Sequence, residues 1–398
     1  MSDTAADDPE RAFRRFPHAL RRWTYRTISH RLRLPLRRRA RNRANREATA
    51  PYRIADRAGR MPRAGHVCVL GDFSGRTGLS RAGLYELERL REEHPELEVH
   101  DLGAALHTGA PVERRDGPPF DRLYLLAAPD TYATLLAALP PERVQAAWRT
   151  GLWVWETPSF PGHWRFAVDL VDEIWTPSDY SRRAIAPAVG AIPVHLRPHA
   201  VALPPSGAGR DDAAAMRARL GIAPDAFMGL AIMDISTCPA RKNPWAHVAA
   251  WMRAFDGDSG CILVLKIRVS RITRVVLDEL RAMTGGTDTV RLLEEEMTDA
   301  EIAALQGAAD VYLSLHRAEG YGLTIHESLA AGTPVIATDF SANAEYGPAF
   351  DAYRGLPYRM VPYRDWTGHY AENGFSWAEV DLNAAVCALR AARRNGTI

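Results

Sequence analysis

The stretch that decides the fold is VYLSLHRAEGYGLTIHESLAAGTPVIATD, residues 311–339. It reads as a buried strand at 311–315, a glycine-rich loop, a helix that ends at a glycine, and a second strand at 334–338. A strand, a helix and another apolar strand in this order predict a unit of a parallel α/β sheet. The stretch also carries two glutamates eight positions apart, Glu319 and Glu327, which a segment that only builds a core does not need.

The rest of the chain from residue 66 repeats this alternation in two sets. Strands are expected at 66–71, 97–102, 122–127, 152–156, 173–178 and 194–199, and then at 226–234, 261–267, 290–294, 311–315 and 334–338. The proline- and glycine-containing stretch 200–225 separates the sets and reads as a linker. A length of 398 residues suits two domains of roughly 150–200 residues each. We therefore predict an α/β protein with two Rossmann-like, doubly wound parallel-sheet domains that face a cleft.

Four segments follow from this pattern. Residues 1–64 form a basic, arginine-rich extension, 65–205 the N-terminal Rossmann-like domain and 206–375 the C-terminal one. The last segment, 376–398, is expected to be a helix that packs back on the N-terminal domain.

The extension differs from the body in charge. Residues 1–64 hold 18 Arg against 6 Asp and Glu, and the remainder holds 32 Lys and Arg against 42 acidic residues. Within residues 11–46, aromatic and aliphatic side chains alternate with 14 Arg and no acid, which resembles an imperfect amphipathic helix. We expect this segment to contact an anionic membrane surface. A plain basic tail is the alternative, and nucleic acid is not expected because no zinc-finger or RNP pattern accompanies the charge.

The sequence also indicates a compartment. No apolar run reaches the ~18–20 residues of a membrane-spanning helix, and the acidic start lacks a signal-peptide pattern. The four cysteines are scattered and form no Cys-x-x-Cys pair. We expect a cytoplasmic protein, attached peripherally to the inner face of the membrane.

The loop between the two glutamates favours a phosphate ligand. Gly320 and Gly322 let the backbone approach a ligand and leave amides free at a helix start. Carboxylates are poor phosphate ligands, so Glu319 and Glu327 are better suited to accept hydrogen bonds from hydroxyls. A nucleotide sugar has phosphates in the middle and hydroxyl-rich ends. Two surface glutamates around a tight turn are the alternative interpretation.

This stretch resembles the E-x7-E signature of retaining glycosyltransferases of family 4, which have the GT-B fold. The segments 154–185 and 241–255 are similar to parts of a bacterial surface-polysaccharide subgroup, and the resemblance spans about 66–394. It implies an N-terminal acceptor domain and a C-terminal donor domain. It also implies that Glu319 binds hydroxyls of the transferred sugar and Glu327 those of the ribose. The loop residues implied at the donor, with amides near its end on the pyrophosphate, are Gly320, Tyr321, Gly322 and Leu323.

Cations are expected beside the phosphates. The chain has 48 Arg and only two Lys, Lys242 and Lys266, so each lysine is a candidate for a position where a compact charge matters. Arg241 and Lys242 lie between a strand and a helix, where they can neutralise a diphosphate leaving group. The family places an Arg and a Lys here some residues apart, whereas in this chain they are adjacent. Lys266 ends a strand and is a candidate second phosphate contact. Solvated charges at a helix cap are the alternative for the pair.

The N-terminal domain offers candidates from two segments. GDFSGRTGLSRAG, residues 71–83, lacks the dinucleotide-binding glycine spacing but resembles the family's glycine-rich loop. Gly78 is assigned to the donor. Arg81 could contact phosphate or the acceptor, and we assign it to the acceptor. WVWETPSFPGHW, residues 153–164, could stack an acceptor sugar, with Glu156 and His163 as contacts. A strand–helix turn and buried packing are the respective alternatives.

No metal or cofactor is expected, because no His/Cys cluster has ligand spacing. The expected activity is retaining, metal-independent transfer of a hexosyl group from a nucleotide sugar to a glycan or lipid-linked saccharide in surface-polysaccharide biosynthesis. Mannose is a guess for the hexose. The alternatives are a non-catalytic nucleotide-sugar or nucleic-acid binding protein and a GT-B-type sugar-nucleotide epimerase.

Overall fold

The stretch quoted above forms the expected strand–helix–strand unit. β10 (Val311–Ser314) and β11 (Val335–Thr338) pair in parallel, and α13 (Leu323–Ala330) connects them. Both strands are apolar and largely buried, which matches a sheet covered on both faces. Gly332 has a φ of +80°, a value that glycine adopts without steric cost, so the chain can turn from the helix into β11.

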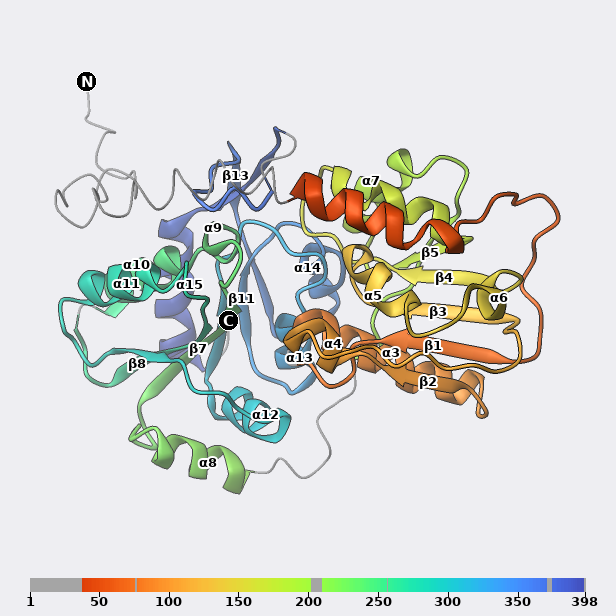
Figure 1. Ribbon diagram of the computed structural model, residues 1–398. Coiled ribbons are helices and arrows are strands. Elements are labelled where there is room, and N and C mark those ends of the chain that lie inside the picture. The colour runs from red at the N-terminus through yellow and green to blue at the C-terminus, as the bar shows by residue number, and fades with distance from the viewer. Residues whose placement is uncertain (1–37, 76, 202–209, 256, 371–373, 397–398) are drawn as a thin grey trace.

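The computed structural model describes residues 38–396, except 76, 202–209, 256 and 371–373. Their strands build two six-stranded parallel sheets, in the orders β2-β1-β3-β4-β5-β6 and β12-β11-β10-β7-β8-β9, and a two-stranded hairpin (Figure 1). The remaining strands are β1 (Val67–Gly71), β2 (Glu98–Asp101), β3 (Arg122–Leu126), β4 (Trp148–Leu152), β5 (Glu173–Thr176), β6 (Val194–Leu196), β7 (Phe227–Asp234), β8 (Cys261–Arg268), β9 (Val290–Leu293), β12 (Tyr353–Leu356), β13 (Tyr358–Pro362) and β14 (Ser376–Val380). The predicted α/β fold class is confirmed.

Helices flank both sheets (Figure 1). The α-helices besides α13 are α3 (Gly78–Glu93), α4 (Gly103–Thr108), α5 (Tyr132–Leu136), α6 (Pro141–Val144), α7 (Asp179–Ile185), α8 (Arg210–Arg219), α9 (Pro239–Lys242), α10 (Pro244–Phe255), α11 (Val275–Thr284), α12 (Asp299–Ala308), α14 (Asn343–Tyr346) and α15 (Leu382–Asn395). Short 3-10 helices are η1 (Ala50–Tyr52), η2 (Pro129–Thr131), η3 (Gly162–Leu170), η4 (Ala186–Ala188) and η5 (Gly347–Ala349). No helix among these residues is long and apolar enough to cross a membrane.

The fourth strand differs from the prediction. β4 covers Trp148–Leu152, whereas we expected the strand at 152–156. Arg149 is the reason, since a charged residue interrupts the apolar run that marks a buried strand. Its guanidinium is buried and donates hydrogen bonds to the carbonyl oxygens of Val144 and Tyr52. These backbone acceptors compensate for the loss of water, and burial lowers the pKa of Arg149 to about 10.

Part of the basic extension belongs to the N-terminal domain, which corrects its expected boundary at residue 64. Residues 38–48 are helical. Tyr52 lies in the core of this domain, where its hydroxyl donates to the Leu139 carbonyl at 2.8 Å, and Ile54 is also buried. The apolar residues Tyr52 and Ile54 of this segment therefore pack into the domain, and only the arginines give the segment its positive charge. Residues 1–37, and with them most of the segment 11–46 assigned to a membrane, lie outside the described residues.

The C-terminal segment also differs from the prediction. α15 packs on α10 within the C-terminal domain, where Ala385 and Leu389 share a core with Trp251. The expectation that this helix packs back on the N-terminal domain is therefore wrong. The hairpin of β13 and β14, which precedes this helix, does contact that domain. Trp377 and Tyr370 belong to the N-terminal core cluster that also contains Trp155.

Candidate active site

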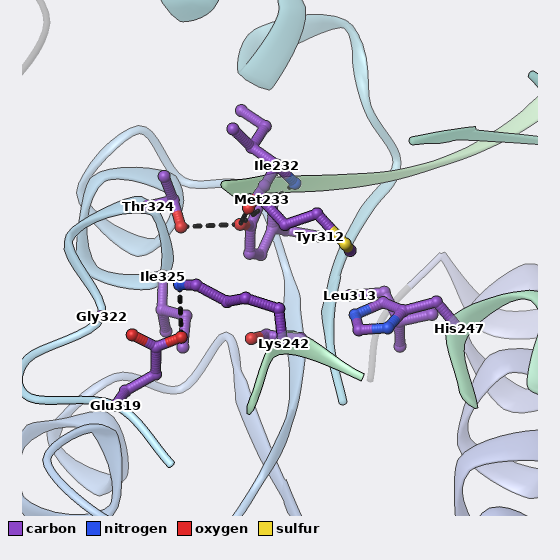
Figure 2. Close-up of a pocket in the computed structure, with 11 residues that line it drawn as sticks. Ile232, Met233, Lys242, His247, Tyr312, Leu313, Glu319, Gly322, Thr324 and Ile325 are labelled. Atoms are coloured by element: carbon purple, nitrogen blue, oxygen red, sulfur yellow. Dashed lines mark hydrogen bonds and ion pairs between the residues drawn. The ribbon is translucent and has the colours of Figure 1, made fainter. Parts of the chain in front are cut away.

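Three of the predicted residues meet at the carboxyl ends of two strands. Glu319 follows β10, and Arg241 and Lys242 lie in α9, which follows β7, the strand beside β10. The Arg241 Nη1 atom lies 3.0 Å from Glu319 Oε2, and Lys242 Nζ donates to Oε1. Figure 2 shows the lysine and the carboxylate facing each other in the pocket that they line. The spatial proximity follows from the sheet, because neighbouring parallel strands end at one edge.

The two cations control the ionisation of Glu319. Only 6% of the surface of Glu319 is exposed to solvent. Burial alone would raise the pKa of its carboxyl group. The charges of Lys242 and Arg241 outweigh burial and lower this pKa to about 2. Burial and the neighbouring Arg241 together lower the pKa of Lys242, although Glu319 opposes them. The buried Glu319 carboxylate is therefore ionised at neutral pH, held by the two cations.

The short helix α9, which carries the two cations, is held in place by residues that the sequence analysis did not single out. Arg317 donates from Nη1 to the Ala240 carbonyl at 2.8 Å, and its backbone N–H donates to the Arg241 carbonyl at 2.8 Å. Its Nε atom lies 2.8 Å from a carboxylate oxygen of Glu379 in β14. Asn243 has a φ of +52° and ends α9. Arg317 stands inside the quoted stretch, but nothing in the sequence indicated its partner 62 residues away.

The glycines of the loop have separate structural roles. Gly322 is the N-cap of α13 and has a φ of +84°, so Leu323 begins the helix with an amide that no intrahelical carbonyl accepts. Gly320 lies against the N-terminal domain, because a Cβ atom there would come within 2.8 Å of Val154 Cγ1. The Tyr321 side chain is buried and its hydroxyl bonds with His326 Nδ1 at 2.8 Å. The structure therefore offers the backbone of this loop, rather than the tyrosine ring, to the pocket.

Glu327 contacts the N-terminal domain. Its Oε1 atom is 3.0 Å from the Tyr85 hydroxyl and 2.9 Å from Arg81 Nε, both in α3. Its Oε2 atom is buried and has no hydrogen-bond partner among the described residues. Burial raises the pKa of Glu327, although Arg81 and Tyr85 oppose this effect. The predicted acceptor residue Arg81 thus contacts the predicted donor carboxylate.

The remaining candidates are more scattered. Glu156 joins the cluster, with Oε1 3.8 Å from Arg241 Nη2. His163 lies among aromatic rings, 6.3 Å from the ring centroid of Trp155. Gly78 begins α3. Lys266 lies in β8, where burial lowers its pKa although Glu296 and Glu295 oppose this effect. Neither Gly78 nor Lys266 is among the residues that line the pocket in Figure 2.

The glycine-rich loop after β1 is organised by Asp72, which sequence reasoning did not select. Its Oδ1 atom accepts from the Gly75 amide at 2.8 Å. Its Oδ2 atom lies 2.5 Å from Ser80 Oγ and 2.7 Å from His107 Nε2. The position of an aspartate directly after a strand was the available signal. Within the described part of the chain, no group of three or more His, Cys, Asp or Glu side chains is placed to hold a metal ion.

Comparisons with known proteins agree with this architecture. The profile of a family described as "Glycosyl transferases group 1" matches residues 274–349, which include Glu319 and Glu327. A glycosyltransferase from Rickettsia africae is 13% identical, with 84% of this chain and 95% of that chain covered and a TM-score of 0.56. Anabaena HepE, solved in complex with UDP and glucose, is 17% identical, with 71% and 83% covered and a TM-score of 0.54. No curated protein matches the chain. The protein therefore has the two-domain α/β fold of GT-B glycosyltransferases.

Proposed function

We propose that the protein is a glycosyltransferase that uses a nucleotide sugar as donor. The observation that carries this proposal is the Glu319 carboxylate held between Arg241 and Lys242 at the start of α13, with Glu327 eight residues further on. Charges of both signs are thus fixed around one pocket, as a ligand with phosphates and hydroxyls requires. The fold supports the proposal, since HepE of the same architecture was solved with UDP and glucose.

We assign each polar group of the site to one part of the nucleotide sugar. The diphosphate would lie between the first amides of α13 and the cations Arg241 and Lys242. Glu319 would accept hydrogen bonds from hydroxyls of the transferred sugar. Glu327 would accept hydrogen bonds from hydroxyls of the ribose. Its Oε2 atom, which has no partner in the described part of the chain, provides an acceptor for them.

We further propose that transfer retains the anomeric configuration and needs no metal ion. The bond from the anomeric carbon to the phosphate oxygen breaks while the acceptor oxygen bonds to that carbon on the same face. The acceptor's proton passes to the departing phosphate oxygen. Arg241 and Lys242 would stabilise the negative charge that develops there. NMR of the product's anomeric centre tests retention, and activity that persists in EDTA tests metal independence.

The proposal extends to the acceptor and to the membrane. We propose a lipid-linked saccharide or glycan of a surface polysaccharide, with mannose as the specific hexose to test first. The basic segment 11–46 would hold the enzyme at an anionic inner leaflet. Because Tyr52 is part of the core, a deletion to residue 64 would damage the fold, and the proper variant lacks residues 1–37. It should lose binding to phosphatidylglycerol vesicles, and unchanged binding would contradict this proposal.

The experiment for the main proposal measures release of nucleoside diphosphate from UDP-, GDP-, ADP- and dTDP-sugars in the presence of a membrane extract. Lys242→Met should lower the rate at least about 100-fold, the cost of losing one group that stabilises developing charge. Arg271→Met, at an exposed cation after β8, is the matched control and should not change it. No release from any donor would contradict the proposal. Interconversion of sugars without release would instead indicate an epimerase.

A further inference from the structure

The helix α10 carries a histidine on its buried face. His247 is only 2% exposed to solvent. The other buried residues of this helix are apolar, namely Pro244, Val248, Ala250, Trp251, Ala254 and Phe255. An apolar side chain would fill the position of His247 without the cost of removing a polar ring from water. Packing alone therefore does not account for a histidine here.

Both ring nitrogens of His247 bond to the backbone. The N–H of Leu315, which directly follows β10, donates to Nε2 at 3.0 Å. The Nδ1 atom lies 2.9 Å from the carbonyl oxygen of Asn243, the residue at which α9 ends. Because Nε2 accepts, a neutral imidazole carries its proton on Nδ1 and donates it to the Asn243 carbonyl. One ring thus bridges the end of α9 and the end of β10.

The bridge joins the two segments that carry the charges of the candidate active site. Lys242 directly precedes Asn243, and Glu319 follows Leu315 in the loop after β10. Figure 2 shows the imidazole among the residues that line the same pocket as Lys242 and Glu319. The position of the cation relative to the carboxylate and the pocket therefore depends on a ring that bonds to neither side chain's charged group.

The bridge requires a neutral imidazole. A second proton, on Nε2, would face the Leu315 N–H and deprive this buried residue's amide of its acceptor. Burial lowers the pKa of His247 to about 4, with help from nearby His316 and Lys242, although bonds to backbone carbonyls oppose them. The ring is thus neutral at neutral pH, as the two bonds demand.

We propose that His247 is a positioning residue for sugar transfer, which holds Lys242 at the departing phosphate through the backbone bridge between Asn243 and Leu315. The proposal rests on the proposed function, which assigns Lys242 to the phosphate oxygen that develops charge. A small displacement of such a group lowers the rate of transfer strongly. Donor binding should change little, because the amides of α13 and the Glu327 carboxylate lie outside the bridge.

Three substitutions separate the two bonds of the ring. His247→Leu removes both, His247→Gln can place an amide oxygen where Nε2 accepts, and His247→Asn can place an amide nitrogen where Nδ1 donates. With the donor that the wild-type protein accepts, His247→Leu and His247→Asn should lower kcat at least about tenfold and change the donor KM less than about threefold. His247→Gln keeps the bond to Leu315 and should retain kcat within about threefold of wild type.

Val248→Ala is the matched control for loss of stability. This next residue of α10 is fully buried in the C-terminal core, and its aliphatic side chain cannot form the bridge. The cavity should lower the melting temperature, while kcat should stay within about twofold of wild type. A fall in kcat as large as that of His247→Leu would show that the histidine only stabilises the fold, which would overturn the proposal.

The same kinetics separate a failure of this proposal from a failure of the proposed function. If wild-type protein transfers sugar but His247→Leu has the wild-type kcat, or His247→Gln and His247→Asn have equal kcat values, the positioning proposal is wrong and the proposed function stands. A raised donor KM with unchanged kcat would also contradict it, because the ring would then contact the donor. The comparison of His247→Gln with His247→Asn decides the matter if His247→Leu does not fold. If wild-type protein releases nucleotide from no donor, both proposals are wrong.

Discussion

Arg81 and Glu327 form an ion pair across the domain interface, with Arg81 Nε 2.9 Å from Glu327 Oε1. The Tyr85 hydroxyl donates to the same oxygen at 3.0 Å. Two residues of the N-terminal domain therefore contact Oε1 of the Glu327 carboxylate, which we assign to ribose binding. The Oε2 atom has no hydrogen-bond partner among the described residues. A nucleotide would have to share or replace these contacts.

The Tyr85→Phe variant tests this competition. Loss of the hydroxyl leaves Glu327 Oε1 with one donor fewer in the free protein, so ribose hydroxyls gain more on binding. We expect nucleoside diphosphates to bind about three- to tenfold more tightly, which corresponds to one hydrogen bond to a carboxylate shared with Arg81. Calorimetric titration measures the change. Tyr124→Phe, in β3 of the same domain, is the control. Weaker binding would show that Tyr85 contacts the ligand itself.

Glu319→Gln should destabilise the fold in a pH-dependent way. The folded-state pKa of about 2 lies below the ordinary value of 4.5, so the ionised carboxylate stabilises the fold above pH 4.5. This contribution is about 3 kcal/mol at neutral pH and is lost as pH falls from 4.5 toward 2. Urea unfolding of both proteins between pH 2 and pH 7 measures it. A difference in unfolding free energy that is constant over this range would contradict the ion-pair account. Glu92→Gln, at an exposed glutamate of α3, should change nothing.

Glu327→Gln should behave in the opposite way. Burial raises the pKa of Glu327 above 4.5, so its ionisation costs the folded state free energy as pH rises above that value. Glutamine removes this cost, and we expect the variant to be no less stable than wild type at pH 7. The same series of urea unfolding curves tests the contrast with Glu319. A marked loss of stability at pH 7 would mean that the Arg81 pair outweighs burial.

Gly320→Ala should hinder domain closure. An added Cβ would lie 2.8 Å from Val154 Cγ1 and 3.1 Å from the Trp155 carbonyl oxygen, both in the other domain. The Gly320 carbonyl also accepts from Ser178 Oγ at 2.7 Å across this contact. We expect kcat to fall at least tenfold with little change in nucleotide affinity, because the nucleotide contacts assigned here come mainly from the C-terminal domain. Gly307→Ala, where a Cβ meets nothing within 4 Å, is the control. Equal kcat values for the two variants would refute this role.

The sequence was sufficient for features that depend on the order of strands. The approach of Glu319 to Arg241 and Lys242 could be predicted, because each follows a parallel strand and such strands end at one edge. The apolar runs of β1, β3, β7, β8 and β10 marked both sheets with boundaries within two residues.

Features that depend on tertiary partners could not be predicted. β4 was misplaced because buried Arg149 is satisfied by carbonyls from outside the strand. Arg81 was assigned to an acceptor because its distance to Glu327, 246 positions along the chain, is set by how the two domains meet. The packing partner of α15 could not be predicted, because it depends on which helix presents an apolar face to it. That helix is α10.

The most direct test of the central claim is thermal stabilisation of the purified protein by a panel of UDP-, GDP-, ADP- and dTDP-sugars, with Glu327→Ala measured beside wild type. A ligand at about 100 times its Kd should add roughly 2.7 kcal/mol to the unfolding free energy. We predict stabilisation by sugars of one base only, and a weaker effect in Glu327→Ala. Equal stabilisation of the variant and wild type, or none by any donor, would contradict the assignment of this cleft to a nucleotide sugar.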